Sequence, residues 1–274
     1  MAQASDSYLL SDSASELERL RLQARVWEPA AEAMLDLIGI RPGWRCVDLG
    51  CGALGILKPL SRRVGAAGKV VGVDTDAKQL AAARAHVLEE GLENVEVLEQ
   101  DAYRTGLPRE SFDFTHVRFL FAPVGRDDEL LTELLGLTKL GGTIAVQEPD
   151  ASAWGYSPES LEWERLKEVI LAAFRSGGGD FNAGRRTYGM LRRAGLEDVQ
   201  IKAAVVALQG RHPYKRVPVL FAASLRRRVL EAGILKGPEL DELILDCERV
   251  AADPETVMTS FVVTQVWGRK PDRS

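Results

Sequence analysis

Short apolar runs rich in β-branched residues alternate with segments of helical periodicity from about residue 45 onward. This alternation is typical of βαβ units, in which a helix connects two neighbouring parallel strands. Glycine-containing turns separate the runs. The pattern predicts five parallel strands, at Arg45–Leu49, Lys69–Val73, Val95–Glu99, Phe112–Arg118 and Thr143–Glu148.

Beyond Glu148 the pattern becomes mainly helical. We expect helices over residues 158–175, 184–194, 217–233 and 238–252, and strands at Val199–Leu208 and Met258–Trp267. Two late strands separated by a helical insertion fit antiparallel edge strands on an otherwise parallel sheet. The inserted helices would then cover the end of the sheet where ligands bind.

An amphipathic helix is predicted ahead of the sheet, over Ser13–Trp27, with Leu17, Leu20 and Val26 among its apolar positions. Pro29 follows this stretch. Because proline is favoured in the first turn of a helix, we expect a second helix to begin there.

A glycine-rich loop, VDLGCGALG, occupies Val47–Gly55 at the junction of the first strand and the next helix. Its glycines at 50, 52 and 55 match G-x-G-x-x-G, a pattern that lets the backbone approach a ligand closely at a helix amino terminus. A dinucleotide pyrophosphate fits this pattern as well as other ligands do. An unliganded tight turn also remains open.

Acidic residues near the ends of the first three strands narrow the choice of ligand. Asp48 precedes the glycine loop, where its charge would repel a pyrophosphate but suits a ligand with an ammonium and a sulfonium group. Asp74 follows the second strand, where a carboxylate accepts hydrogen bonds from ribose hydroxyls in either cofactor class. Asp101, with Ala102, follows the third strand and can accept from an adenine amine. Together the three acids favour a cationic cofactor.

Composition and charge argue against several classes of partner and site. The 274 residues are 46% hydrophobic and 27% charged, as in one large α/β domain. Lys and Arg total 35 against 40 Asp and Glu, and this net charge of −5 disfavours a nucleic acid partner. No leader or bilayer-spanning apolar run is evident, which predicts a cytoplasmic protein without a membrane partner. The three cysteines, Cys46, Cys51 and Cys247, fit neither a disulfide framework nor a metal site.

Several motifs together carry a family resemblance. They include VDLGCGALGILKPLSRRVG, VVGVD, SFDFTHVRFLF, GGTIAVQEPD and AFRSGGGDFNAGRR. The chain resembles the class I S-adenosylmethionine-dependent methyltransferases over most of its length, in particular actinobacterial-type small-molecule and natural-product enzymes. The resemblance implies an α/β fold with a Rossmann-like, seven-stranded, mostly parallel sheet. It divides the chain into an N-terminal helical lid at 1–40, a cofactor-binding core at 41–150, and helical cap insertions with the last two strands at 151–274.

The same resemblance implies a set of contacts to S-adenosylmethionine. The methionine part would lie near the glycine loop, the ribose near the second strand and the adenine near the third, while an N-terminal segment closes over the cofactor and an arginine meets its carboxylate. In that order the residues are Gly50, Cys51 and Gly52; Asp74 and Thr75; Asp101 and Ala102; Tyr8 and Gln23; and Arg118. Two alternatives stay open: Tyr8 as a staple for the following helix, and Arg118 in a structural salt bridge.

Catalytic residues are harder to locate, because methyl transfer depends mainly on positioning and needs a base only when the acceptor carries a proton. Relatives often carry a histidine after the fourth strand, where this chain has Pro123. His116 lies inside a strand and is expected to be a core residue. Glu148 and Asp150 follow the fifth strand, where they can serve the acceptor or cap the next segment. His212 begins the second insertion and is a further candidate.

An apolar acceptor pocket is expected from Trp154 and Phe181, with Arg185 as a polar contact; core packing and a solvated helix charge are the alternatives. The leading hypothesis is methylation of oxygen, nitrogen or carbon on a small, fairly apolar metabolite. One alternative is a nicotinamide-dependent oxidoreductase. Another is a cyclase or binding protein that keeps the cofactor without transferring its methyl group. A homodimer is an assembly that the sequence leaves open.

Overall fold

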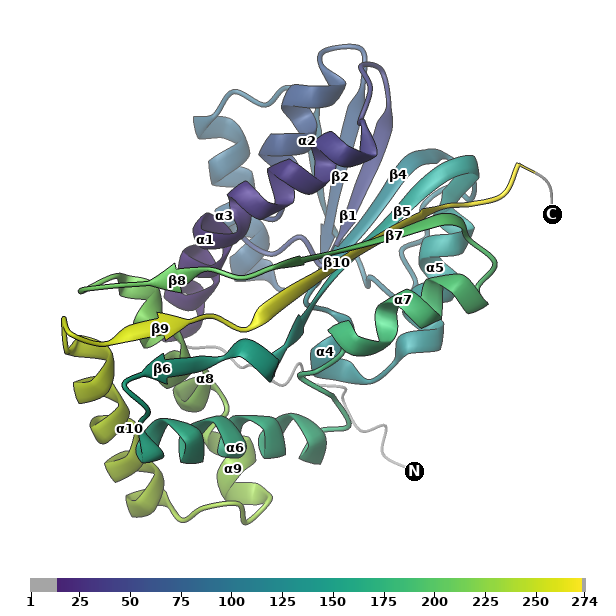
Figure 1. Cartoon of the computed structure of the whole chain (residues 1–274). Helices are drawn as coiled ribbons and strands as arrows, with labels where there is room; N and C mark the ends of the chain where they lie inside the picture. The colour runs from purple at the N-terminus through teal and green to yellow at the C-terminus, as the bar shows by residue number, and fades with distance from the viewer. Residues whose placement is uncertain (1–13, 273–274) are drawn as a thin grey trace.

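A seven-stranded sheet forms the centre of the computed structural model, which describes residues 14–272. Its strands run in the order β3-β2-β1-β4-β5-β10-β7 (Figure 1). The first five strands along the chain, β1 to β5, pair in parallel, as the alternation of apolar runs predicts. The bounds are β1 Arg45–Leu49, β2 Lys69–Asp74, β3 Val95–Glu99, β4 Phe112–Arg118, β5 Thr138–Asp150, β7 Glu197–Ala204 and β10 Val262–Arg269.

The two late strands differ from the expected antiparallel edge pair. β10 enters between β5 and β7 and is antiparallel to both of them. Because β10 is antiparallel to β5 and β7 is antiparallel to β10, the edge strand β7 has the same direction as β1–β5. Among the strands of this sheet, only β10 runs in the opposite direction. The expectation of two antiparallel strands is therefore wrong for β7, because the order of the strands across the sheet follows from tertiary pairing that a local pattern does not encode.

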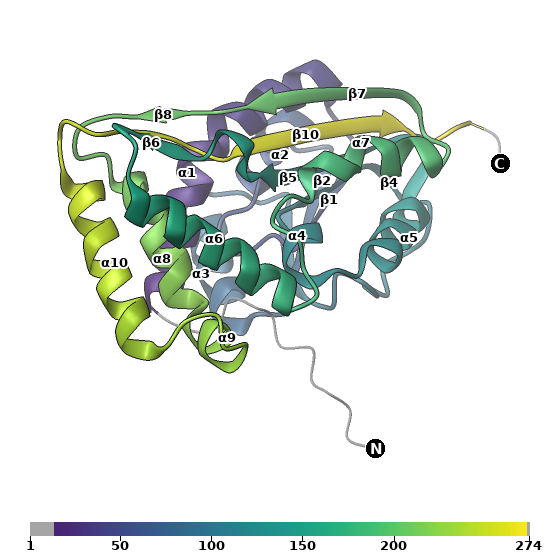
Figure 2. The same ribbon diagram turned by 60° about the horizontal axis from the view of Figure 1, so that its bottom comes forward.

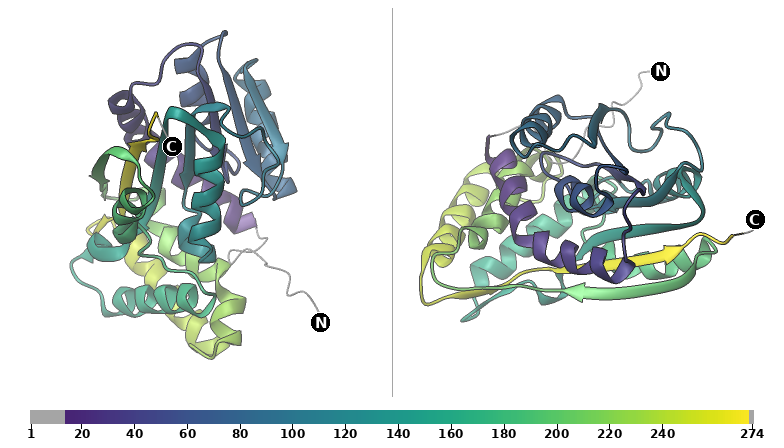
Figure 3. Two further views of the ribbon diagram at one scale, coloured as in Figure 1. Left: turned by 90° about the vertical axis from the view of Figure 1, so that its right-hand side faces the viewer. Right: turned by 90° about the horizontal axis from the view of Figure 1, so that it is seen from above.

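Helices cover both faces of this sheet (Figure 3). Alternate residues of β1 face opposite sides, so Cys46 belongs to a buried cluster with residues of α1 and α2, whereas Val47 belongs to the cluster that includes residues of α5 and α7. The helices that cover the two faces of the sheet are α1 Ala14–Ile38, α2 Leu57–Val64, α3 Ala77–Glu89, α4 Phe121–Val124, α5 Asp127–Leu137 and α7 Gly184–Arg193.

The N-terminal helix is one continuous element, so the expected break at Pro29 does not occur. Proline removes one backbone N–H, but tertiary contacts hold the helix on both sides of it. The Trp27 indole N–H donates to the Tyr214 hydroxyl at 2.8 Å, and Gln265 Nε2 donates to the Ala30 carbonyl at 3.0 Å. Burial of Met34 and its neighbours fixes the second half against the sheet.

A helical cap lies beyond one end of the sheet, in the lower part of Figure 1. The predicted helices at 158–175 and 238–252 are present, whereas 217–233 divides into two helices. The cap elements are α6 Leu161–Ser176, α8 Val217–Ser224, α9 Arg226–Glu231, α10 Gly237–Ala252, and the short 3₁₀ helices η1 Ala151–Ala153 and η2 Pro213–Arg216.

A second, three-stranded antiparallel sheet supports the cap (Figure 2). Its strands are β6 Gly155–Ser157, β9 Val257–Thr259 and β8 Ala207–Leu208, in that order. Strands of two or three residues carry no measurable alternation, which is why the sequence pattern does not reveal this sheet.

The Lys215 ammonium joins the parts of the cap that are distant in sequence. It is fully buried, and its three N–H donors are shared among the carbonyls of Gly210, Asp253 and Thr256, at 2.9, 2.8 and 2.8 Å from Nζ, and the Thr256 hydroxyl, at 2.7 Å. Burial lowers the pKa of Lys215 from its usual value. The four oxygen acceptors compensate for much of the cost of burying the ammonium, so η2, the end of α10 and the start of β9 are held together.

Among residues 14–272, no helix combines the length and the apolar character needed to cross a lipid bilayer.

Candidate functional site

A cavity of about 650 Å³ opens where β1, β2, β3 and β4 end. Loops after the strands form one side of it, and helix α1 and the cap form the other. This volume lies within the usual range for small-molecule sites. Of the residues predicted to contact a cofactor, the wall includes Gln23, Gly50, Cys51, Gly52, Asp74, Thr75, Asp101, Ala102 and Arg118.

The glycine loop depends on backbone conformations that favour glycine. Gly50, Gly52 and Gly55 have φ of +66°, +56° and +48°. Gly55 is the most constrained, because an added Cβ would lie 2.5 Å from Asp48 Oδ2 and 2.8 Å from the Cys51 carbonyl oxygen. The loop therefore closes tightly on Asp48 and leaves its outer side to the cavity.

Asp48 does not line the cavity, which corrects its predicted cofactor contact. Its side chain is buried beneath the glycine loop, where Oδ2 accepts a hydrogen bond from the Ile56 N–H at 3.0 Å and Oδ1 lies 2.6 Å from His116 Nδ1. The carboxylate therefore holds the loop from behind. Because Asp48 does not reach the cavity, its charge cannot select a sulfonium ligand over a pyrophosphate by direct contact.

His116 is a fully buried core residue, as expected, and its two partners assign the donor and acceptor roles of its ring nitrogens. Nε2 lies 2.8 Å from Gln147 Nε2, and an amide NH₂ can only donate, so the ring nitrogen accepts. The proton is then on Nδ1 and is donated to Asp48. From Gln147 the chain of hydrogen bonds continues to Gln265 at 2.8 Å and then to the carbonyl of Ala30 in α1.

The Asp74 carboxylate stands at the end of β2 and lines the cavity. Oδ2 accepts from the Gly52 N–H at 2.8 Å and Oδ1 from the Asp76 N–H at 2.9 Å. Burial raises the pKa of Asp74. The hydrogen bonds from these N–H groups favour the charged form and offset part of the increase. Each carboxylate oxygen keeps acceptor capacity for hydroxyls in the cavity.

The end of β3 supplies the next part of the wall. Asp101 is exposed and accepts from the Tyr103 N–H at 2.9 Å, and Ala102 is 7% exposed. The Arg126 guanidinium lies 4.1 Å from the centre of the Tyr103 ring and pairs with Glu129. This corner offers one accessible carboxylate beside Ala102 and the Tyr103 side chain.

Arg118 has an unused hydrogen-bond donor at the cavity. Nη2 donates to the Gly55 carbonyl at 3.4 Å, whereas the buried Nη1 has no partner in the described chain. No acid of the described chain forms an ion pair with this guanidinium, so the alternative of a structural salt bridge does not apply. Burial lowers the pKa of Arg118, while nearby Asp48 opposes that shift. An unpartnered donor on a largely buried cation fits an anionic group of a ligand.

Helix α1 brings its own polar groups to the wall. Arg19 is 1% exposed, donates to Gln23 Oε1 at 2.7 Å and lies 4.2 Å from the centre of the Phe221 ring. Arg19 was not predicted from the sequence, because a charge in an amphipathic helix gives no sign of facing inward. Tyr8 lies outside the described residues.

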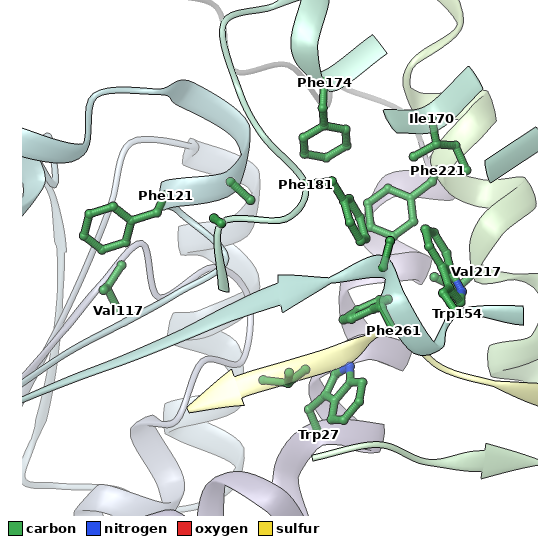
Figure 4. Close-up of a cluster of buried hydrophobic side chains, with 14 of the residues drawn as sticks. Trp27, Val117, Phe121, Trp154, Ile170, Phe174, Phe181, Val217, Phe221 and Phe261 are labelled. Carbon is green, nitrogen blue, oxygen red and sulfur yellow. The ribbon is translucent and has the colours of Figure 1, made fainter. Parts of the chain in front are cut away.

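Phenylalanines form the cap end of the cavity (Figure 4). Phe181 packs edge-to-face against Phe174 and Phe221, with ring centres 5.2 and 5.8 Å apart. Trp154 is buried behind them and stacks on Phe181 at 5.0 Å. Phe181 therefore lines the cavity as predicted, whereas Trp154 supports it from the core.

Glu148 is a structural residue rather than a group facing the acceptor. It is fully buried and accepts from the backbone N–H groups of Leu120, Phe121 and Ala122 at 2.8, 3.0 and 3.1 Å, which caps α4. Burial raises the pKa of Glu148 to about 7, against these three donors. Its predicted catalytic placement is wrong because β5 directs the carboxylate to the start of the short helix.

The other predicted acceptor-side groups also lie away from the cavity wall. Asp150 pairs with Arg185 at 2.6 Å and accepts from the Ser152 N–H at 2.7 Å, so it caps η1 as the alternative reading held. Arg185 is largely exposed, as a solvated helix charge would be. His212 is exposed and caps η2 by accepting from the Tyr214 N–H at 3.2 Å. All three are satisfied by local contacts.

Comparisons with known sequences agree with this geometry. Residues 46–142 match a family model described as a methyltransferase domain. Nocamycin O-methyltransferase of Saccharothrix syringae is 39% identical over 87 residues, which are 32% of this chain and 31% of that protein. Aklanonic acid methyltransferase DauC of Streptomyces sp. strain C5 is 32% identical over 133 residues, 47% of this chain and 59% of that protein. The matched segments span less than two thirds of either relative.

Solved structures share the fold over most of the chain. A SAM dependent methyltransferase from Aquifex aeolicus superposes with a TM-score of 0.51 at 19% identity, over 93% of this chain and 99% of that one. The [4+2]-cyclase SpnF does so with a TM-score of 0.50 at 22% identity, over 89% and 83%. At these identities the likeness establishes the Rossmann-like architecture alone.

The contact between Gly55 and Asp48 can be tested by Gly55→Ala. Gly39 is a matched control, because it also has a positive φ, of +75°, but open space around it. We expect Gly55→Ala to lower the free energy of unfolding in urea by about 1–3 kcal/mol more than Gly39→Ala does. Equal losses would show that backbone conformation alone requires the glycine.

The raised pKa of Glu148 predicts a pH dependence of stability. Since the folded pKa of about 7 exceeds the usual value of 4.5, the folded protein binds this proton more tightly than the unfolded chain. The stabilisation from this proton is complete at pH values below the pKa of the unfolded chain. It is lost as the pH rises through the pKa of Glu148 in the folded protein. The stability advantage of the wild type over Glu148→Gln should therefore shrink by about 3 kcal/mol between pH 4 and pH 8.

Glu133 provides a control of opposite sign. Burial opposes its ionisation, but hydrogen bonds from Thr105 and Arg109 lower the pKa of Glu133 overall. The advantage over Glu133→Gln should therefore fall as the pH is lowered. A constant difference between wild type and Glu148→Gln across the range would contradict the burial argument.

Proposed function

We propose that this chain, which carries a methyltransferase domain over residues 46–142, is an S-adenosylmethionine-dependent methyltransferase acting on a small, fairly apolar molecule. The observation that carries the proposal is the composition of one cavity wall. A glycine loop, the carboxylates of Asp74 and Asp101, and the open donor of Arg118 meet an aromatic surface there. This set matches a ligand with a carboxylate, a ribose and an adenine at one end of the cavity.

Each group of the cofactor has a proposed partner. Arg118 Nη1 would donate to the carboxylate of the methionine part, with Gly50 and Gly52 close to its backbone. Asp74 would accept from the ribose hydroxyls and Asp101 from the adenine amine, with Ala102 against the ring. Helix α1 would serve as a lid, because Gln23 and its neighbours in α1 reach the same cavity from the opposite side.

Bound S-adenosylmethionine supplies an electrophilic methyl group on a sulfonium. Among described residues, the wall contains no His, Lys or Glu side chain that would act as a base. The Tyr103 hydroxyl is a poor one, because burial raises the pKa of Tyr103 above its usual value. The protein's contribution would be to hold the acceptor in line and exclude water, leaving any deprotonation to the acceptor's own ionisation.

Two other functions have less support. A nicotinamide-dependent oxidoreductase fits the glycine pattern, but the family match over residues 46–142 favours methyl transfer. A cyclase that keeps the cofactor intact is compatible with the fold, since SpnF shares it. Product analysis separates this case from methyl transfer.

Turnover is the direct test. With a true acceptor, each mole of methylated product should be accompanied by one mole of S-adenosylhomocysteine, measured by liquid chromatography and mass spectrometry with a methyl-labelled donor. Unlabelled product formed while the donor stays intact would replace the proposal with the cyclase function. Tight binding of NAD with none of S-adenosylhomocysteine would favour the oxidoreductase.

The ribose assignment predicts that Asp74→Ala weakens S-adenosylhomocysteine binding by roughly ten- to a hundredfold in calorimetry, because hydrogen bonds to a charged acceptor contribute about 1.5–3 kcal/mol. Asp101→Ala should weaken it less, since an adenine amine gives one hydrogen bond where the ribose gives two. Asp74 also accepts from the Gly52 N–H, so the urea midpoint of each variant must be measured alongside. Unchanged affinity in a folded Asp74→Ala protein would refute the assignment.

A further inference from the structure

Three consecutive arginines in α9 have different surroundings. Arg226 pairs with Asp241, and Arg227 lies 4.0 Å from Glu231. Arg228 is partly exposed, lines the cavity and has no hydrogen-bonding or acidic partner for its guanidinium among residues 14–272. The two arginines outside the cavity are therefore neutralised by the protein, whereas the one inside it is not.

The cavity wall has all of its acids at one end, where Arg118 and Arg126 also line it. Its three carboxylates, Asp74, Asp76 and Asp101, all follow β2 or β3, at the end assigned above to the cofactor. Among the described residues, the cap contributes Arg228 to the wall and no acid. Arg19 of α1 adds a second guanidinium close to Phe221, which belongs to the cap. The described cap residues therefore bring one guanidinium and no carboxylate to this part of the wall.

The same region is strongly apolar. Phe174, Phe181 and Phe221 line it with edge-to-face contacts. A neutral apolar molecule would use these rings but leave the Arg228 guanidinium without a partner. A polar cation would be repelled. A molecule that combines a flat apolar body with an anionic group satisfies both parts of the surface.

Resting on the proposed function, we infer that the methyl acceptor is an apolar organic anion and that Arg228 binds its carboxylate or an equivalent oxyanion. The phenylalanines hold the apolar body between the anion and the cofactor end of the cavity. Arg228 acts as a specificity residue in this arrangement. It selects the charge of the acceptor and does not touch the group that receives the methyl.

Binding of matched probes tests the inference without knowledge of the natural acceptor. Affinities of 2-naphthoate and 2-naphthamide, which share a ring system and differ in charge, would be measured by calorimetry with saturating S-adenosylhomocysteine. The wild type should bind the anion roughly tenfold more tightly, the lower end expected for a charge-assisted hydrogen bond at a partly exposed site. Arg228→Gln should reduce the difference to less than about twofold, because the charge that distinguishes the probes is removed.

Arg226→Gln is the matched control, since it removes the same charge from the same helix but outside the cavity. It should keep the preference for 2-naphthoate. Arg228→Glu should reverse the preference, toward 2-naphthylmethylammonium over 2-naphthoate, which shows that a folded pocket remains.

The outcomes separate the two proposals. Equal affinity for both probes in the wild type, binding of neither, or an undiminished preference in Arg228→Gln would overturn the inference while S-adenosylhomocysteine still binds. Absence of S-adenosylhomocysteine binding would instead overturn the proposed function, and the same probes added to the protein alone would still decide the role of Arg228.

Discussion

The buried Asp48 carboxylate is the interaction on which the rest of the site depends. It lies at the end of β1 under the glycine loop, and both Gly55 and the Ile56 N–H are positioned by it. His116 holds it from the neighbouring strand. A buried carboxylate is tolerated only when its hydrogen bonds are complete, so the loop, the imidazole and the strand ends constrain one another.

That constraint extends across the sheet. Gln147 donates to His116 through its amide nitrogen, and its carbonyl oxygen accepts from Gln265, which also donates to the Ala30 carbonyl of α1. Four neighbouring strands thus carry one line of buried polar side chains between the cofactor loop and the N-terminal helix. The position of the proposed lid is fixed by the core, in addition to its contacts with the cap.

Local patterns predicted the five parallel strands and the glycine loop well, because burial on both faces and positive φ leave direct marks on the sequence. The same information failed for β7, Pro29 and the second sheet, where tertiary pairing decides the outcome. It also failed for Glu148 and Asp150. A carboxylate after a strand serves either a ligand or a neighbouring helix, and which one depends on where α4 and η1 begin. Cap residues such as Arg228 carry no local signal, since an arginine in a short helix is usually solvated.

The position of β10 has a consequence for how the chain is assembled during synthesis. Within residues 14–272 β7 pairs only with β10, and about sixty residues separate the two strands in sequence. As the chain leaves the ribosome, β1–β5 can form a parallel sheet early, but β5 keeps an unpaired edge and β7 has no neighbour until residues 262–269 emerge. Lys215 likewise cannot form its hydrogen bonds to the carbonyls of Asp253 and Thr256 until those residues have been synthesised. Closure of the sheet and completion of the cap are therefore late and coupled events, and the edge of β5 stays open to pairing with other chains until β10 has been made.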